Sequence, residues 1–361
     1  MNMELKYHDI ILRDMRESDI DDEIRWNTTQ TEWALWDAPW ETEEELKTFD
    51  PETHRQKELE WLAKPRPAHR RCLEIDTADG VHLGAVNCYC IDGDCNWLEK
   101  APETEEERQK ARWAVGLDIH DPAYWNGGWG AQALCAFIRY HLDGGYTGLY
   151  TQTWSGNARM IALAKKLGFR ECRRKEGFRQ VRGETYDGLT FQLDRAAFEA
   201  YCASPGAAVC VRPVEDPGEK EAVAASVLAD LPDWFGLPDS TAEYVRVSRG
   251  LPFWAAVEGG KTVGFAALKE TAPKTGEIYV MGVRPEHHRT GVGQRLFGAL
   301  YRCAKERGYA FLQVKTVQEG RYPEYDRTNA FYRAVGFTEL ECFPTLWDEW
   351  NPCQVLVMAV K

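Results

Sequence analysis

The sequence has no long hydrophobic run. No stretch of its 361 residues approaches the roughly 18 apolar positions that a membrane-spanning helix needs. Its amino terminus, MNMELKYHDI, lacks the cationic segment followed by an apolar one that marks a secretion signal. Hydrophobic residues at 44% and charged residues at 28% are typical of a soluble globular chain. We therefore expect a cytoplasmic protein without a membrane partner.

The cysteines lack the paired spacing of a structural metal site. Eleven are scattered along the chain, and the tightest group, Cys88, Cys90 and Cys95 with His82 upstream, contains no CxxC pair. An odd number of cysteines in a long chain without an export signal also argues against a disulfide framework. We expect free thiols in strands and turns, and no metal.

Basic residues are fewer than acidic ones, and the formal net charge is −13. Residues 207–361 carry 18 Lys and Arg against 20 Asp and Glu, which leaves 26 against 37 for residues 1–206, a net −11. Nucleic acid and anionic membranes are poor partners for such a chain, whereas a cationic substrate would be attracted to it. Solubility alone is the competing explanation of these charges.

Length and a break in composition indicate two domains. A chain of 361 residues is long for one hydrophobic core and comfortable for two. The small, turn-forming segment 203–208, ASPGAA, follows the helical-looking Asp194–Cys202 and precedes the strand-like Val209–Val211. We place a first domain at residues 1–204 and a second at residues 205–361.

One order of elements occurs twice: an apolar strand, a Gly-rich turn, an amphipathic helix, a second strand, and a short helix ending in Gly-Phe. In the first half these are Trp113–Ile119, Trp125–Gly130, Ala131–Leu142, Leu149–Thr153 and about Ala158–Leu167. In the second half they are Glu277–Val283, His288–Gly293, Gln294–Arg307, Phe311–Thr316 and Asn329–Val335. The recurrence predicts two domains of the same fold.

A strand, a Gly-containing turn and a helix amino terminus together suit a pyrophosphate. The backbone N–H groups and the positive end of the helix dipole point at one spot, and glycine allows the anion to approach them. This explains Gly128 and Gly130 in the first half, and Gly291 and Gly293 in the second. One such turn could arise from packing alone, but two at similar spacing favour phosphate binding.

The segment Val283–Gly293, VRPEHHRTGVG, resembles the acetyl-coenzyme A motif of the GNAT acetyltransferase superfamily, Arg/Gln-x-x-Gly-x-Gly/Ala. His288 stands where Arg or Gln is usual, which leaves the backbone part of the motif intact. In the first half, Tyr124–Gly130, YWNGGWG, is similar to the branch that contains ribosomal-protein N-terminal acetyltransferases and some aminoglycoside acetyltransferases. Together the two resemblances extend over nearly the whole chain.

The resemblance implies an α+β (mixed α/β) fold with two tandem GNAT-like domains. Each would have a mixed, mostly antiparallel sheet, flanked by helices, whose fourth and fifth strands splay apart around acetyl-CoA. The residues expected at this cosubstrate in the second half are Val283, His288, Arg289, Thr290, Gly291, Val292, Gly293 and Asn329. Those in the first half are Trp125, Asn126, Gly127, Gly128, Trp129, Gly130 and Asn157.

The resemblance also implies direct attack of an amine on the thioester, which requires a base or water relay and favours a weak acid for the departing thiolate. Tyr332 stands where family members often place that acid, and a phenol donates a proton without being charged near neutral pH. Packing of the ring is its alternative role. Glu277 could act as the base through water, or simply be a solvated strand residue.

The first half has Ala164 at the tyrosine position. Either water protonates the thiolate there, or this domain is a non-catalytic coenzyme A scaffold. Asp118 occupies a place similar to the catalytic aspartate of some aminoglycoside acetyltransferases, with capping of the turn before Pro122 as the alternative. Asn157 and Asn329 are expected to open the two short helices as amino-terminal caps, near the cosubstrate.

Aromatic and acidic residues elsewhere could form acceptor pockets. These are Trp33, Trp36 and Trp40 in the first half, and Trp234, Phe235, Asp348 and Glu349 in the second. Core packing and solvated loops are the alternatives. We expect an N-acetyltransferase that transfers acetyl to a small cationic primary amine, aminoglycoside-like or a polyamine, in a monomer or homodimer. A protein N-terminus as acceptor, and one inert domain, are the other hypotheses.

Overall fold

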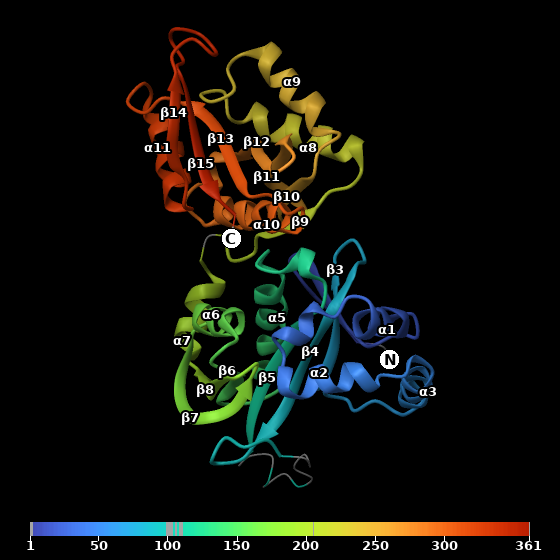
Figure 1. Cartoon of the computed structure of the whole chain (residues 1–361). Coiled ribbons are helices and arrows are strands. Elements are labelled where there is room, and N and C mark those ends of the chain that lie inside the picture. Colours follow the sequence, from blue (N-terminus) through green and yellow to red (C-terminus); the bar gives the residue numbers. More distant parts are fainter. Residues whose placement is uncertain (1–2, 99–103, 105–106, 108–110, 205, 361) are drawn as a thin grey trace. The chain divides into compact units, whose positions relative to one another are not determined.

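The computed structural model describes residues 3–98, 104, 107, 111–204 and 206–360. The chain divides into two compact units, Met1–Ala208 and Val209–Lys361. In Figure 1 the first unit runs from blue to yellow-green and the second from yellow to red. The boundary predicted between residues 204 and 205 falls on residue 205, which lies outside the described residues.

The first unit contains an eight-stranded sheet with the order β1-β2-β3-β4-β5-β6-β8-β7. Its described strands are paired antiparallel except for β5 and β6, which are parallel. The strands are β1 (Glu4–Tyr7), β2 (Ile10–Arg13), β3 (Cys72–Thr77), β4 (His82–Ile91), β5 (Arg112–Ile119), β6 (Leu149–Trp154), β7 (Phe169–Val181) and β8 (Glu184–Leu193).

Helix α5 packs across β1, β2 and β5 of this sheet, while α1 packs on α3, and α6 on β6 and β7. The helices are α1 (Asp19–Thr28), α2 (Pro39–Thr48), α3 (Pro51–Leu62), α5 (Trp129–Asp143), α6 (Ala158–Lys166) and α7 (Arg195–Cys202). Short 3-10 turns, η1 (Glu32–Leu35) and η2 (Pro122–Tyr124), precede α2 and α5.

The second unit repeats this plan with a seven-stranded sheet ordered β14-β15-β13-β12-β11-β10-β9. Helix α10 packs on β9, β10, β11 and β12, and α8 on β11 and β12. The strands are β9 (Cys210–Pro213), β10 (Phe253–Glu258), β11 (Lys261–Ala272), β12 (Thr275–Val283), β13 (Phe311–Val317), β14 (Thr338–Phe343) and β15 (Cys353–Ala359). The helices are α8 (Pro217–Ala229), α9 (Pro238–Ser248), α10 (Val292–Glu306) and α11 (Pro323–Ala334), with a 3-10 turn η3 (Pro285–His287).

Each sheet splays apart at its parallel strand pair. Strands β5 and β6 pair only through Trp113 with Leu149 and Ala114 with Tyr150. Strands β12 and β13 pair from Thr275 with Phe311 to Glu277 with Gln313, and no further. Beyond these points the facing backbone edges have no partner strand. The predicted mixed sheet with a splayed central pair is therefore confirmed in both units.

Apolar spacing explains why α10 forms and where it packs. Val292, Leu296, Leu300 and Ala304 recur every four residues and are all buried in the core of the second unit. That period places them in one stripe facing the sheet. The helix thereby holds its amino terminus beside the end of β12, where the Gly-rich turn lies.

The predicted start of the last short helix in the second half was wrong. Helix α11 begins at Pro323, six residues before the expected Asn329. Proline at the first helical position has its φ already set for a helix and has no N–H group to lose. Glu324 and Asp326 add negative charge to the first turn, which the helix dipole favours. Asn329 is therefore in the helix interior and is not a cap.

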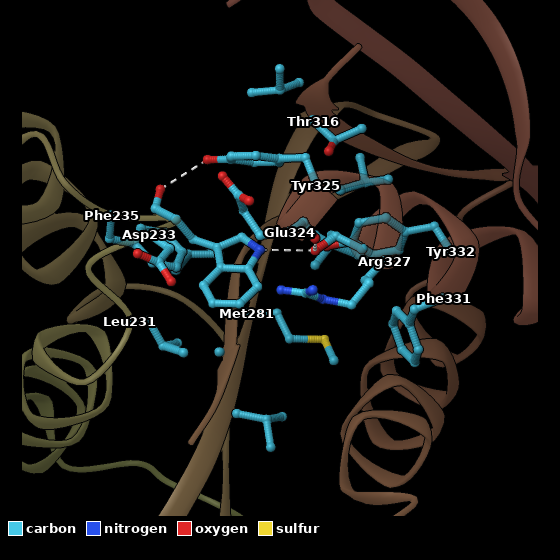
Figure 2. A pocket seen from close by; sticks show the side chains of 18 of the residues that line it. Leu231, Asp233, Phe235, Met281, Thr316, Glu324, Tyr325, Arg327, Phe331 and Tyr332 are labelled. Carbon is cyan, nitrogen blue, oxygen red and sulfur yellow. Dashed lines mark hydrogen bonds between the residues drawn. The ribbon is translucent and has the colours of Figure 1, made fainter. Parts of the chain in front are cut away.

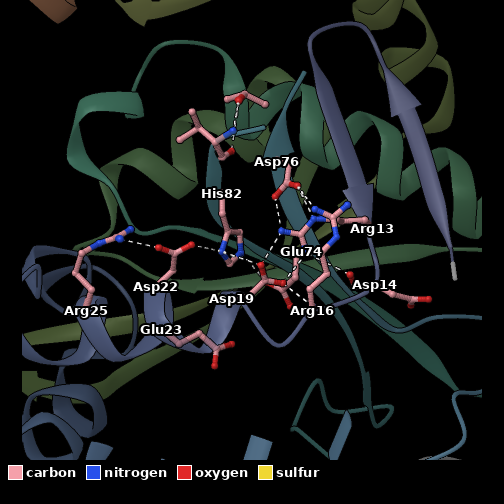
Figure 3. Close-up of polar contacts among 12 residues, drawn as sticks. Arg13, Asp14, Arg16, Asp19, Asp22, Glu23, Arg25, Glu74, Asp76 and His82 are labelled. Carbon is pink, nitrogen blue, oxygen red and sulfur yellow. Dashed lines mark hydrogen bonds and ion pairs between the residues drawn. The ribbon is translucent and has the colours of Figure 1, made fainter. Parts of the chain in front are cut away.

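A buried ionic network ties α1 to the sheet of the first unit (Figure 3). The Arg13 guanidinium pairs with the carboxylates of Asp19 on α1 and Asp76 on β3, and all three side chains are 5% exposed or less. His82 places Nδ1 3.0 Å from Asp22 and Nε2 3.1 Å from Glu74. His82 thus has carboxylate partners, whereas Cys88 and Cys90 lie further along β4 and Cys95 in the following turn.

Candidate active site

The Gly-rich turn of the second unit leads directly into α10. Gly291 precedes the helix with φ 85°, and Arg289 also has a positive φ of 62°. The Thr290 hydroxyl donates to the His287 carbonyl at 2.7 Å, which fixes the turn. No heavy atom lies within 4 Å of a Cβ built on Gly291. The first amide groups of a helix have no intrahelical acceptor, so this open space suits an anion.

The first unit has the same construction. Gly128 precedes α5 with φ 101°, and Asn126 has φ 58°. Gly130 and Gly293 were expected to make room for the anion. Instead, each allows its helix to approach neighbouring side chains. A Cβ on Gly130 would lie 3.0 Å from Leu117, and one on Gly293 would lie 3.2 Å from Phe331. Packing explains Gly130 and Gly293, and backbone conformation explains the first glycine of each turn.

A cavity of about 1470 Å³ joins this turn of the second unit to the gap between β12 and β13. Its walls come from the α8–α9 connection, β12, β13, α11 and the segment before β15. Figure 2 shows side chains of the α8–α9 connection, such as Leu231 and Phe235, on one side, and Arg327 and Phe331 of α11 on the other. The splayed strands therefore open into one continuous space.

Trp234 organises the end of the cavity near the Gly-rich turn. Its indole N–H donates to the Thr328 hydroxyl at 3.0 Å, and the Tyr325 hydroxyl donates to its carbonyl oxygen at 2.9 Å. Its ring meets the His288 ring edge-on at 5.8 Å, and the Arg327 guanidinium lies 5.9 Å from the ring centre. Arg289 lines the same cavity. Cationic or titratable groups thus surround the site suited to an anion.

Tyr332 lies on α11 and lines the cavity, although little of the residue is exposed. Its ring packs edge-on against Phe331 and Phe337, at 5.4 and 5.8 Å between centres. Burial raises the pKa of its phenol above the ordinary value, so the group stays protonated at neutral pH. The ring packs against its neighbours, and the neutral phenol belongs to a residue that lines the same cavity as β12 and β13.

The splay also carries buried polar atoms without a partner among the described residues. The Asn329 amide donates to the Val317 carbonyl at 3.0 Å, but its Oδ1 accepts no hydrogen bond, and the Thr316 hydroxyl is likewise unsatisfied. The unpaired edges of β12 and β13 lie at the same place. Such orphan groups are costly unless a ligand or water satisfies them. The Asn329 Oδ1 and the Thr316 hydroxyl are themselves buried, so it is the unpaired backbone edges of β12 and β13 that a polar, extended ligand arm with amide groups fits.

Glu277 does not line this large cavity. It lies at the last paired position of β12, where the Lys315 ammonium and the Gln313 amide each donate to its carboxylate at 2.7 Å. It lines a smaller cavity of about 510 Å³ that shares Tyr244, Tyr279 and Lys315 with the large one. Glu277 therefore does not reach the large cavity directly, and a proton passing between the two cavities would have to travel through water.

The remaining expected residues of the second unit fall into two groups. Residues that line the large cavity are Val283, His288, Arg289, Gly291, Gly293, Trp234, Phe235 and Asp348. Thr290 and Val292 hold the turn and the core instead, and Asn329 contacts β13 from beneath the cavity wall. Glu349 lines neither of the two cavities.

In the first unit, Asp118 lies half-buried on β5, and burial, together with the charge of Asp37, raises its pKa well above the ordinary value. The turn before Pro122 is capped by Asp121, whose carboxylate accepts from the Ala123 amide at 2.8 Å. Capping is thus not the role of Asp118. Asn157 is a cap as predicted, since it accepts from the Met160 amide at 3.0 Å.

Aromatic residues crowd the first unit's turn. The Trp125 indole donates to the Ile119 carbonyl at 2.5 Å. The Arg159 guanidinium lies 3.9 Å from the centre of the Trp125 ring and 4.2 Å from that of Trp36. Trp40 meets the Trp154 ring edge-on. The other expected turn residues of this unit, Gly127 and Trp129, lie just before and within α5, where Trp129 is buried.

Several lining residues escaped the sequence analysis, notably Tyr325 and Arg327. Both lie in the first turns of α11, before the helix start that the sequence predicted at Asn329. The signal that could have identified them is Pro323, a residue typical of a helix start, followed by acidic residues.

Two family models match the chain, and both describe an acetyltransferase (GNAT) domain. One matches residues 9–170 and the other residues 249–339. The chain belongs to the GNAT acetyltransferase family. Members of this family use acetyl-CoA. The two GNAT domains lie in tandem, one in each compact unit.

The chain is similar to the uncharacterised N-acetyltransferase YsnE of Bacillus subtilis, with 31% identity over 101 residues, 28% of this chain and 65% of that protein. It is 34% identical to the N-alpha-acetyltransferase RimI of Mycobacterium tuberculosis over 85 residues, 23% of this chain and 49% of that protein. The match thus spans less than two thirds of either relative. A solved structure of yncA from Salmonella typhimurium with its cofactor acetyl-CoA matches 43% of this chain and 95% of that one, with 19% identity and a TM-score of 0.34.

No helix within the described residues combines the length and the hydrophobicity needed to cross a membrane.

Proposed function

We propose that the chain is an acetyl-CoA-dependent N-acetyltransferase that acts on a small cationic primary amine, and that its second domain is catalytic. The observation that carries this proposal is the single cavity of about 1470 Å³ in the second unit. It connects the anion-suited turn at Gly291, the unpaired strand edges and the Tyr332 side chain. Those are the parts that direct acetyl transfer requires, in the order in which a nucleotide, its thioester arm and an acceptor would occupy them.

Each part has a chemical task. The backbone amides at the start of α10, with Arg289 and Arg327, bind the pyrophosphate. The free edge of β12 donates to the thioester oxygen and stabilises the charge that develops on it. The amine nitrogen forms its bond to the acetyl carbon as the carbon–sulfur bond breaks. Tyr332 then gives its phenolic proton to the departing thiolate, and recovers one from solvent.

Selection of the acceptor falls to the smaller cavity and its neighbourhood. Asp239, Glu243 and Glu277 line that cavity, and Asp348 lies at the adjoining wall of the large one. Carboxylates attract a polyamine or aminoglycoside, and Glu277 receives the amine proton through water. The Lys315 ammonium donates a hydrogen bond to the Glu277 carboxylate and orients it. We propose free acetyl-CoA and a small amine as the partners of a monomer or homodimer in the cytoplasm.

A second candidate is acetylation of a protein amino terminus. It is favoured by the match to RimI, whose printed name is an N-alpha-acetyltransferase. Incubating the protein with acetyl-CoA and either spermidine, kanamycin or a short peptide with a free amino terminus separates the candidates. Mass spectrometry of the products reports which amine gains an acetyl group. Acetylation of the peptide alone would overturn the small-amine proposal and leave the transferase intact.

Calorimetric titration with acetyl-CoA tests the cosubstrate sites. We expect two sites in the parent, because both units contain a left-handed glycine before a helix. Gly128→Trp and Gly291→Trp should each remove one site by filling the space where phosphate binds. Gly145→Trp and Gly308→Trp are matched controls, since each glycine also has positive φ and lies just beyond the far end of α5 or α10.

The outcomes separate the roles of the two domains. Loss of all binding in Gly291→Trp alone would show that the first domain does not bind acetyl-CoA, and would contradict both two cosubstrate sites and a coenzyme A scaffold. Loss of turnover in Gly128→Trp, with turnover retained in Gly291→Trp, would assign catalysis to the first domain and contradict the proposal. No heat of binding in the folded parent would remove acetyl-CoA as the cosubstrate.

A further inference from the structure

Two cysteines far apart in the sequence of the first unit lie side by side. The Cys202 Sγ, at the carboxyl end of α7, is 3.6 Å from the Cys135 Sγ in the middle of α5. Cys135 is buried, whereas Cys202 is only partly buried. A disulfide has its sulfur atoms about 2.05 Å apart, so the two need to approach by roughly 1.5 Å.

An ion pair between the same two helices lies close to the two sulfur atoms. One turn after Cys135 on α5, Arg139 pairs with Glu199 of α7, with 3.6 Å between nitrogen and oxygen. Glu199 lies about one turn before Cys202. The sulfur pair and this exposed ion pair are thus two contacts, about one turn apart, between the same faces of α5 and α7. The sulfur pair does not depend on a loop or on a chain end.

The surroundings favour a negative charge on one of the two sulfurs. The hydrogen bond between the two sulfurs, the Arg139 guanidinium and the Tyr7 hydroxyl together lower the pKa of Cys202 to about 6, although burial and Glu199 oppose them. The same hydrogen bond and burial raise the pKa of Cys135 above its usual range. The Arg139 guanidinium also lies 5.5 Å from the Tyr7 ring, which keeps it near the pair.

We propose that Cys135 and Cys202 form a reactive dithiol, a modification site that exchanges with small-molecule disulfides and closes into an internal disulfide joining α5 to α7. Cys202, the less buried of the two, is the attacking sulfur, and Cys135 is the resolving one. The site is separate from both Gly-rich turns. Closure constrains α5, whose amino terminus forms the anion-suited turn of the first unit.

The chemistry with oxidised glutathione balances in two steps. The Cys202 thiolate forms a bond to one glutathione sulfur, the glutathione disulfide bond breaks, and one glutathione thiolate leaves. Cys135 then loses its proton to solvent and attacks the Cys202 sulfur, which expels the second glutathione thiolate. Two electrons pass from the protein dithiol to the glutathione disulfide, and the two thiolates released are protonated to glutathione.

The test incubates the full-length protein with oxidised glutathione and maps its peptides without reduction. We expect one internal disulfide between the peptides that contain Cys135 and Cys202, a loss of two hydrogen atoms from the intact mass, and the other nine cysteines still free. In Cys135→Ser, Cys202 should instead keep one glutathione. The disulfide should also raise the melting temperature of the first unit by roughly 5–15 °C.

Two further measurements on the parent protein do not depend on the folding of a variant. Alkylation of Cys202 in the parent should proceed at a nearly constant rate from pH 7 to pH 9, whereas that of the exposed Cys172 should rise by up to about tenfold per pH unit. Equal pH profiles for the two cysteines would overturn the reactive thiolate. A stable glutathione adduct on Cys202 of the parent, with Cys135 still free, would overturn the resolving role of Cys135.

Discussion

At the scale of single residues, His82 shows how a buried side chain can couple stability to pH. Both of its ring nitrogens face carboxylates, Asp22 at 3.0 Å and Glu74 at 3.1 Å (Figure 3). A carboxylate accepts hydrogen bonds, so both nitrogens must carry a proton unless a carboxyl group supplies it. Burial opposes the charge, but the hydrogen bond and charge of Glu74 outweigh it and raise the pKa of His82.

The sign of the pH dependence follows from these shifts. A histidine with a raised pKa stabilises the fold fully below about pH 6.5, and this contribution is lost as the pH rises through the raised value. Glu23 acts in the same direction, because burial and the neighbouring Glu74 raise its pKa to about 8. Other groups facing this cluster include Arg13, Asp19 and Glu58, together with Arg25 beside Asp22 and His54, which lies 2.9 Å from the Glu23 carboxylate. We therefore expect the contribution of His82 and Glu23 to the free energy of unfolding of the first unit to fall from pH 6 to pH 8, whereas His54, whose pKa burial lowers, acts in the opposite direction.

Substituting His82→Gln should lower that free energy by about 3 kcal/mol at pH 6, since it leaves buried carboxylates without their cation. It should also flatten the pH dependence, by up to about 1.4 kcal/mol per pH unit. Urea unfolding followed by tryptophan fluorescence at several pH values measures both effects. His8→Asn, at an exposed turn position with φ 51°, is the control. An unchanged slope in His82→Gln would show that this histidine is neutral in the folded protein.

Tyr332 is the second residue whose role can be isolated. Tyr332→Phe keeps the ring contacts with Phe331 and Phe337 and removes only the hydroxyl that we propose as the proton donor. We expect kcat to fall about 100-fold, with the dissociation constant for acetyl-CoA within twofold of the parent. Steady-state rates at saturating acetyl-CoA test this. Tyr322→Phe, which removes another hydroxyl from the same cavity, is the control, and an equal loss there would assign the effect to the cavity wall.

At the scale of elements, the sequence predicted best where local chemistry decides the structure. The periodic apolar stripe of α10 and the glycine before it locate the strand, turn and helix that carry the site, because both signals lie within a few residues. The beginning of α11 was missed, because residues 323–328 carry no apolar period. Only Pro323 and its acidic neighbours mark that start.

The placement of side chains relative to the splay depends on register between distant segments. Glu277 is on the predicted strand, but its pairing with β13 brings Lys315 and Gln313 to its carboxylate and keeps it out of the large cavity. Asn329 is near the site for a reason that spacing could not supply, since α11 starts earlier and turns its amide toward Val317. Register and helix starts are thus the limits of the sequence argument.

At the scale of the whole molecule, the repeated order of elements was the most informative feature of the sequence. Each unit has its own sheet, its own splay and its own left-handed glycine before a helix. The two GNAT domains nevertheless differ in charge, with −11 of the net −13 in residues 1–206. A cationic acceptor therefore experiences different electrostatic fields at the two domains.

This asymmetry makes the salt dependence of the reaction a test of which domain receives the acceptor. If the first domain is the one that turns over, the Michaelis constant for spermidine should rise several-fold between 20 and 200 mM NaCl, because screening weakens the attraction of a trivalent cation to an acidic surface. If the second domain turns over, as proposed, the nearly balanced charge of residues 207–361 predicts a weaker rise. A monoamine acceptor provides the control, since its single charge should respond least. A strong rise of the Michaelis constant for spermidine with salt that persists in Gly128→Trp would show that the first domain is not its cause. Carboxylates of the second domain, such as Asp239 and Glu243, would then be its source.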